Sequence, residues 1–188
     1  MINFLKNIKE EGKKWAYGRF WFFRALLILY FCYVFIRHIW NSEYSSLFGG
    51  INLGIHELGH LIFYPLGEFL SVFGGSFLQI FVPLLSFWIF LKQEDYFALS
   101  VSSCWLSTSL FGVSLYIGDA RRQELPLVSP FSGEEVIHDW NYLLSKTGLL
   151  SFDTFLSYFV KFFAIFFMLS GILWGFYLLK FMFSKKSL

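Results

Sequence analysis

The stretch Leu47–Leu66, LFGGINLGIHELGHLIFYPL, decides the fold, because it is apolar along almost its whole length. Its length is close to the roughly 20 residues that an α-helix needs to cross a hydrocarbon core of about 30 Å. Yet it contains His56, Glu57 and His60, whose side chains can carry charge. Such groups are costly inside lipid and usually mark function. The stretch therefore predicts a membrane-spanning helix with a functional site in it.

Further apolar runs lie on both sides of this stretch. Hydrophobic residues make up 56% of the chain and charged residues only 15%, where soluble domains have about 25% charged residues. We therefore predict an all-α integral membrane protein with about five transmembrane helices and one short amphipathic loop helix. The predicted spans are 20–40, 47–66, 69–91, 96–118 and 155–183.

The organisation that these spans imply is one membrane-embedded domain over residues 20–183. An amphipathic arm, 1–19, precedes the domain, and a basic tail, 184–188, follows it. The polar loop 119–151 lies between the last two spans, and long loops are often functional. In this loop Ser132 and Glu135 have capping-box spacing ahead of apolar residues at helical intervals, which predicts the loop helix.

The distribution of Lys and Arg predicts the orientation. Five spans would place the arm and the polar loop on one side, and that side would hold most of the basic residues, so we predict a cytosolic N-terminus. The net charge of +2 gives no indication of a nucleic-acid partner. The expected partners are the lipid bilayer and a membrane-protein or peptide substrate, and the sequence indicates no oligomeric state.

The motif His56-Glu57-Leu58-Gly59-His60 predicts a metal site. Residues four apart lie on one face of a helix, so both imidazoles can reach one metal ion, for which zinc is the natural choice. Glu57 lies about 100° around the helix, where it can act as general base on a water bound to the metal. An alternative is a pair of core histidines bonded across helices. A di-iron site or a metal transporter would need more ligands than the spans contain.

A catalytic zinc usually has three protein ligands, so one ligand should lie outside the motif. Asp119, directly after the fourth span, and His138, in the polar loop, are the two candidates. Asp119 could instead pair with Arg121 or Arg122, and His138 lies beside the polar face of the loop helix, where a solvated surface position is slightly favoured. Gln79 is a candidate for binding substrate or a developing oxyanion, with bonding between helices as the alternative.

The segment Gly54–His60, in an apolar helix, resembles the zinc-binding helix of the site-2 protease family of intramembrane metallopeptidases. In that family a second span follows this helix, and a third carries an Asp ligand, so the resemblance favours Asp119 over His138. The segments Gly74–Gln79 and His138–Asn141 are similar to uncharacterised bacterial members of this wider group. The resemblance implies a bacterial inner (plasma) membrane.

Together these features predict an intramembrane zinc metalloendopeptidase of the HExxH type, in which Glu57 activates a zinc-bound water. The ligands would be His56, His60 and Asp119, with His138 as the alternative third ligand. A rival hypothesis is a non-catalytic metal-binding membrane scaffold or partner protein of the same fold.

Overall fold

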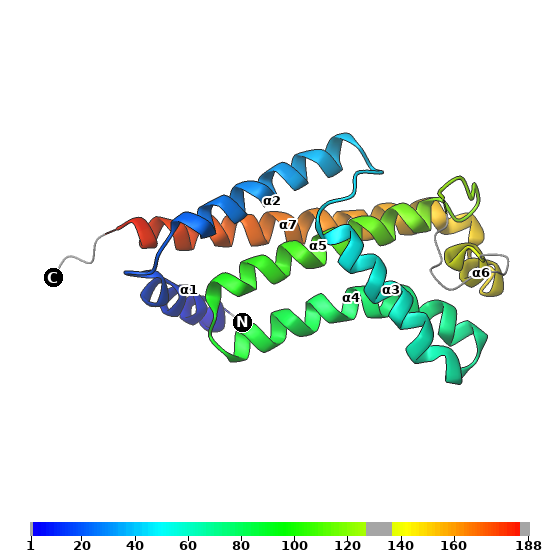
Figure 1. Cartoon of the computed structure of the whole chain (residues 1–188), viewed down its shortest axis with the longest axis horizontal. Coiled ribbons are helices and arrows are strands. Elements are labelled where there is room, and N and C mark those ends of the chain that lie inside the picture. The colour runs from blue at the N-terminus through cyan, green and yellow to red at the C-terminus, as the bar shows by residue number, and fades with distance from the viewer. Residues whose placement is uncertain (1, 127–136, 185–188) are drawn as a thin grey trace.

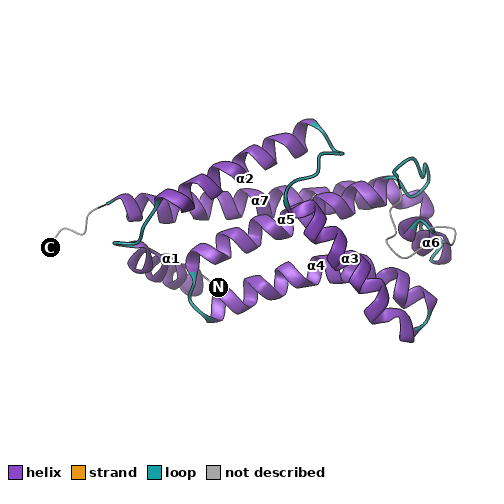
Figure 2. Ribbon diagram, in the orientation of Figure 1, coloured by secondary structure: helices purple, strands orange, loops and turns teal. Residues whose placement is uncertain are grey.

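The computed structural model describes residues 2–126 and 137–184, and these are helical or in short connections, without a strand (Figure 2). The helices are short at both ends of the molecule and long between them (Figure 1). They are α1 (Ile2–Ala16), α2 (Phe22–Trp40), α3 (Phe48–Phe63), the 3-10 turn η1 (Tyr64–Leu66), α4 (Glu68–Lys92), α5 (Tyr96–Gly118), α6 (Asp139–Lys146), the 3-10 turn η2 (Leu150–Phe152) and α7 (Asp153–Phe183).

Helices α5 and α7 form the centre of the bundle. They approach closely because small and hydroxyl-bearing residues of α5 face α7: Ser100, Ser103 and Ser107 donate hydrogen bonds to backbone carbonyls of α7 at 2.6, 2.8 and 2.6 Å. Gly171 and Gly175 lie opposite, where an added Cβ would collide with α5 or α2. Small residues and interhelical hydrogen bonds of this kind are typical of helix packing in membranes.

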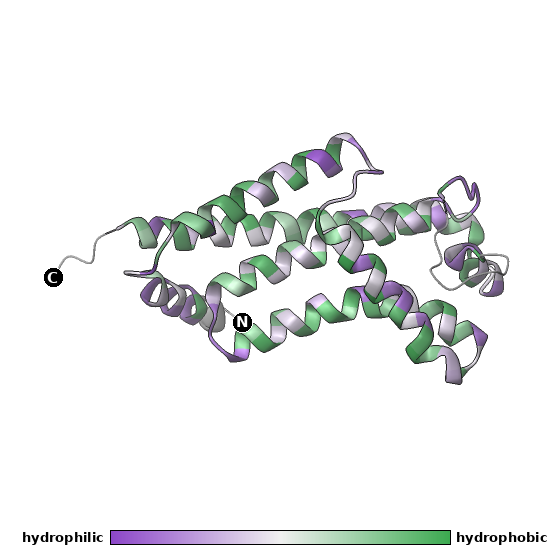
Figure 3. Ribbon diagram, in the orientation of Figure 1, coloured by the Kyte–Doolittle hydropathy of each residue, from purple (hydrophilic) through white to green (hydrophobic). Residues whose placement is uncertain are grey.

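Four helices are long and apolar enough to cross a membrane: Phe22–Trp40, Glu68–Lys92, Tyr96–Gly118 and the segment Leu150–Phe183. Their bounds agree closely with four of the predicted spans. Figure 3 shows the same division, with hydrophobic residues along the long helices and hydrophilic ones in α1 and α6. The prediction of about five spans is wrong by one, because α3 is not among these helices.

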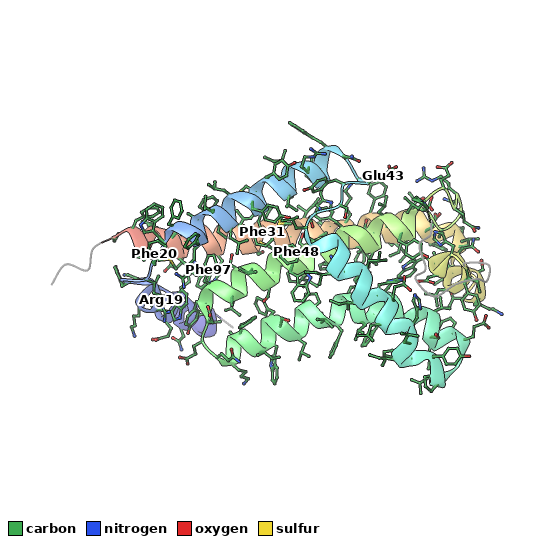
Figure 4. The ribbon with its side chains drawn as sticks, viewed as in Figure 1. Arg19, Phe20, Phe31, Glu43, Phe48 and Phe97 are labelled. Atoms are coloured by element: carbon green, nitrogen blue, oxygen red, sulfur yellow. The ribbon has the colours of Figure 1, made fainter. Side chains whose placement is uncertain are left out.

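Helix α3 is too short to cross a membrane, because it begins inside the bundle. The Leu47 backbone N–H donates to the Tyr30 hydroxyl at 3.0 Å, and the Phe48 ring stacks on Phe31 with centroids 5.7 Å apart, as Figure 4 illustrates for the two labelled rings. Phe31 lies nine residues before the end of α2, or about 14 Å along a helix. The chain after α2 thus turns back into the bundle, and α3 runs outward from there.

This shorter α3 changes the predicted topology. Near the start of α2 lie α1, the turn between α4 and α5, and the end of α7: the Tyr177 hydroxyl donates to the Lys9 carbonyl and the Trp174 indole to the Tyr96 carbonyl. The end of α5, with residues 119–126 after it, and α6 lie at the opposite end (Figure 1). The prediction that the arm and the polar loop share one side is therefore wrong, since it assumed that the chain crosses once more at α3.

Helices α3 and α4 form a tight antiparallel pair at the end that holds α6. Pro65 lies in the turn between them, and Gly67 has a φ of 95°, which favours glycine. Gly59 and Gly74 face each other so closely that a Cβ on Gly59 would collide with the Gly74 carbonyl. This approach brings side chains of α4 within hydrogen-bonding distance of the α3 histidines.

Candidate metal centre

His56 and His60 lie on the face of α3 that is turned toward α4 and α6. Their spacing of four residues places the rings one turn apart, and the two Nε2 atoms are 3.1 Å from each other. His56 is buried and His60 is half-buried. The two nitrogens that could bind a metal therefore point to one place, as the sequence predicts.

Asp139, the first residue of α6, completes the group. Its Oδ2 atom lies 2.9 Å from Nε2 of His56 and 3.2 Å from Nε2 of His60. Ligand atoms of all three residues lie within 4.8 Å of one another. The three side chains could hold a metal ion, and they are the only such group among residues 2–126 and 137–184.

Three hydrogen bonds position α6 so that Asp139 faces the histidines. The Asp139 backbone N–H donates to the Tyr116 hydroxyl at 3.0 Å. The Trp140 indole N–H donates to Ser76 of α4 at 3.1 Å, and the Asn141 amide donates to the Ala120 carbonyl at 2.8 Å. These bonds tie α6 to α4 and to the end of α5. The carboxylate is thus held in place by the contacts of α6 with α4 and with the end of α5.

The other ring nitrogens of the histidines also have partners. His56 Nδ1 lies 3.1 Å from the Gln79 Oε1 atom, and His60 Nδ1 lies 2.9 Å from the Ser71 carbonyl. Both partners are acceptors, so each Nδ1 donates to its partner, and each Nε2 is left facing Asp139. This is how metal-binding histidines are usually oriented.

Gln79 makes hydrogen bonds to two neighbouring helices, α3 and α5. Its carbonyl oxygen accepts from His56, and its amide donates to the Ser109 carbonyl at 3.4 Å. Both polar groups are engaged with the protein, although the side chain also lines the cavity beside the histidines. The structure thus favours bonding between helices, the alternative left open by the sequence.

The histidines also determine the charge state of Asp139. Burial by itself would raise the pKa of this carboxyl, but the hydrogen bonds from His56 and His60 lower it more strongly, so the pKa lies below its usual range. Asp139 is only 6% exposed. It is therefore an ionised buried carboxylate facing two imidazoles, which is a donor set suited to a divalent cation.

Glu57 lines the same cavity as this group. The cavity has a volume of about 850 Å³, and its walls include His56, Glu57, His60, Asp139 and Tyr116. Glu57 is half-buried, and no ion pair to it occurs among the described residues. Its carboxylate can therefore approach a molecule that occupies the cavity.

Neither Asp119 nor His138 contacts the histidine pair. Asp119 is 1% exposed, and its carboxylate oxygens accept from the backbone N–H groups of Glu124 and Leu125 at 3.1 and 3.0 Å. His138 caps α6, since its Nδ1 accepts from the Asn141 N–H at 3.2 Å. The structure places Asp139 beside the histidines, where the resemblance favoured Asp119.

The expectation that His138 is a solvated surface residue is wrong. This side chain is 3% exposed, and its Nε2 lies 3.4 Å from Oδ2 of Asp119. The ring lies against Tyr116, with centroids 4.3 Å apart. Its burial follows from its position at the first turn of α6, which packs against the end of α5. The capping box at Ser132 and Glu135 lies outside the described residues.

Sequence reasoning missed Asp139 and Tyr116. Asp139 is adjacent to His138 and is the first residue of α6, where a carboxylate is also favoured by the helix dipole, so its residue type alone does not indicate a metal ligand. Tyr116 is an ordinary aromatic residue near the end of an apolar helix.

No protein-family model, curated protein or solved structure matches the chain, so the chemistry of the site is inferred from its geometry.

Proposed function

We propose that the chain is an intramembrane zinc metalloendopeptidase whose ligands are His56, His60 and Asp139 and whose general base is Glu57. The observation that carries the proposal is the convergence of Asp139, from a distant loop helix, on the two histidines of an HExxH motif. Two core histidines bonded across helices would not require an ionised carboxylate between them. A carboxylate is also costly to bury without a counter-charge.

Zinc is the metal that this donor set favours. Two imidazole nitrogens and one carboxylate oxygen are the protein ligands of many catalytic zinc sites, which leave a fourth position open. The cavity beside the group provides room for that position. The partners of the two Nδ1 atoms, Gln79 and Ser71, would support the ligands from outside, as partners of metal-bound histidines usually do.

When bound, zinc would polarise a peptide carbonyl and make a water molecule more acidic. Glu57 would then accept a proton from the attacking water and donate it to the amine that leaves. Asp139 and the two histidines would keep their positions throughout, because the hydrogen bonds to α4 and α5 hold them. The resemblance of Gly54–His60 to the site-2 protease family supports this reading.

The distribution of charge supports an orientation as well. If the four long helices cross the membrane, the end with α1 collects eight described Lys and Arg residues and the end with α6 collects five. By the positive-inside tendency the α1 end lies in the cytosol, and the metal site then opens at the opposite face of a bacterial inner membrane. The eight are Lys6, Lys9, Lys13, Lys14, Arg19, Arg24, Lys92 and Lys180; the five are Arg37, Arg121, Arg122, Lys146 and Lys161.

The test is to measure zinc and proteolysis in the same detergent-purified samples. Wild type should carry near one zinc per chain and hydrolyse a quenched fluorogenic mixture of apolar peptides. Glu57→Gln should keep the zinc and lose hydrolysis by about 10²–10⁴-fold, the usual contribution of general-base catalysis. His60→Ala should lose both.

Other outcomes would redirect the proposal. Samples that bind zinc but show no Glu57-dependent hydrolysis would favour the metal-binding scaffold. Wild type that binds no zinc, even after zinc is supplied, would exclude the peptidase. Chelator-resistant hydrolysis in His60→Ala would indicate a contaminating enzyme.

A further inference from the structure

A second cavity, of about 510 Å³, lies at the same end of the molecule between α2, α5 and α7. Arg121, Arg122 and Lys161 line it and give it positive charge. Among the described lining residues the only carboxylate is Asp153, and Arg121 binds it at 2.7 Å. Arg122 lies 4.0 Å from the Asp119 carboxylate. We call this cavity the cationic cleft. Lys161 is the lining cation that has no ion pair among the described residues, so the cleft suits an anionic ligand.

Lys161 is the most informative of these cations. It lies eight residues after the start of α7, or about 12 Å along the helix, within an apolar segment. Among the described residues Lys161 takes part in no ion pair, and it is half-buried. An ionisable group in a membrane segment is a functional candidate by default, and this one has no protein partner to neutralise it.

His38, on the α2 side of the cleft, supplies a second and independent observation. The side chain is 5% exposed, and its ring stacks on Phe111 with centroids 4.5 Å apart and planes at 6°. Both ring nitrogens are buried and lack a hydrogen-bond partner within the described part of the chain. Buried polar atoms are nearly always paired, so these nitrogens indicate a ligand that bonds to them.

The cationic cleft adjoins the cavity of the metal centre. His38, Ser42 and Leu115 line both cavities, so one extended ligand can occupy the two at once. Its anionic part would lie by Lys161 and His38, while its remaining length would reach Glu57. A lipid could bind through its phosphate in the cationic cleft alone. A peptide that is cleaved at the metal centre must also extend to that centre, so we favour a peptide.

We propose that the cationic cleft binds a carboxylate of the peptide substrate, through Lys161 with His38 as a hydrogen-bond donor. This proposal rests on the proposed function, since it names the feature by which that site would select peptides. The neutral imidazole offers one N–H donor, and the Lys161 ammonium offers charge. A charge-assisted hydrogen bond of this type is about twice as strong as a neutral one.

Binding to metal-free protein tests this without relying on hydrolysis. The probes are dansyl-trileucine as the free acid and as its C-terminal amide, in a neutral maltoside detergent with chelator. Energy transfer from the tryptophans of the chain reports binding. Wild type should bind the acid about tenfold more tightly than the amide, as expected for one charge-assisted contact. Lys161→Gln should bring the two affinities to near parity.

Matched variants make the result specific. Lys146→Gln removes the same charge at the same end of the molecule, but Lys146 lies outside the cleft, so the preference for the acid should persist. His38→Phe keeps an aromatic ring on Phe111 and removes both nitrogens, and it should lower the preference several-fold. It also serves if Lys161→Gln fails to fold.

Three results would overturn the proposal. One is equal binding of acid and amide by wild type, and another is a preference that survives in Lys161→Gln. The third is displacement of the acid by phosphatidylglycerol but not by phosphatidylcholine, which would identify an anionic lipid as the ligand. Each of these can occur while zinc content and hydrolysis that depends on Glu57 stand, so the two proposals can fail separately.

Discussion

Two buried carboxylates, Asp119 and Asp139, lie beside histidines at the same end of the molecule, yet their surroundings differ. Asp119 accepts hydrogen bonds from the backbone of the loop that follows it, at Glu124 and Leu125. Asp139 has its carboxylate directed at two imidazoles that line a cavity. The Asp119 carboxylate therefore stabilises the turn after α5, whereas the Asp139 carboxylate is available to a ligand.

This difference shows that a carboxylate can serve a metal site only if its oxygens are not already used by backbone hydrogen bonds. Position in the sequence does not reveal which oxygens are used. Asp119 directly follows α5, which packs on α3, so a carboxylate there looked well placed. Its oxygens are used by the turn that leads the chain away from the helix. Asp139 is the first residue of α6, which docks on α4 and α5.

The largest expected effect is on zinc affinity. Asp139→Ala should weaken zinc binding by more than about 100-fold, which exceeds the 10–100-fold typical of a residue that only supports a ligand. Asp119→Ala should change it by less than about threefold, because its carboxylate contacts no ligand. Zinc affinity is measured by competition with a fluorescent chelator in detergent. A comparable loss in both variants would mean that the two carboxylates share one role.

The next largest effect is on thermal stability, and here the Asp119 substitution should be the damaging one. Asp119→Ala leaves the Glu124 and Leu125 N–H groups without their acceptor, and a lost hydrogen bond to a charged group is worth about 1.5–3 kcal/mol. For a chain of this size each kcal/mol shifts Tm by roughly 2–4 °C. Thermal unfolding of metal-free samples should therefore show a lower Tm for Asp119→Ala than for wild type. An unchanged Tm would show that the turn does not need this carboxylate.

The four long helices could be predicted because length and hydropathy determine them, and residues 96–118 coincide with α5. The sequence could not show that the span predicted over 47–66 is a shorter helix. It depends on the docking of Leu47 and Phe48 on Tyr30 and Phe31, which hydropathy does not encode. In the site, the i, i+4 spacing predicted the paired histidines. Asp139 could not be predicted, because its place depends on where α6 packs.

A smaller effect concerns the close approach of α4 to the histidines. A Cβ on Gly75 would lie 2.7 Å from Nε2 of His60 and 2.8 Å from Nε2 of His56. Gly75→Ala should therefore move the rings away from Asp139 and lower zinc affinity by about tenfold, the size of a lost supporting contact. Gly54→Ala is the matched control, because a Cβ there meets nothing within 4 Å. Equal affinities in the two variants would mean that the rings can adjust.

The smallest expected effect is a dependence of stability on pH in the metal-free protein. The histidines lower the pKa of Asp139 despite its burial, so its folded pKa lies below the unfolded value of about 3.9. The stabilisation is therefore fully present above that unfolded value and is lost as the pH falls through the folded pKa. The Tm advantage of wild type over Asp139→Asn should accordingly persist as the pH falls from 7 to 5 and shrink below about pH 4. An advantage that already disappears between pH 7 and 5 would show that the carboxylate is not held ionised by His56 and His60. In that case the contrast with Asp119 would rest on geometry alone.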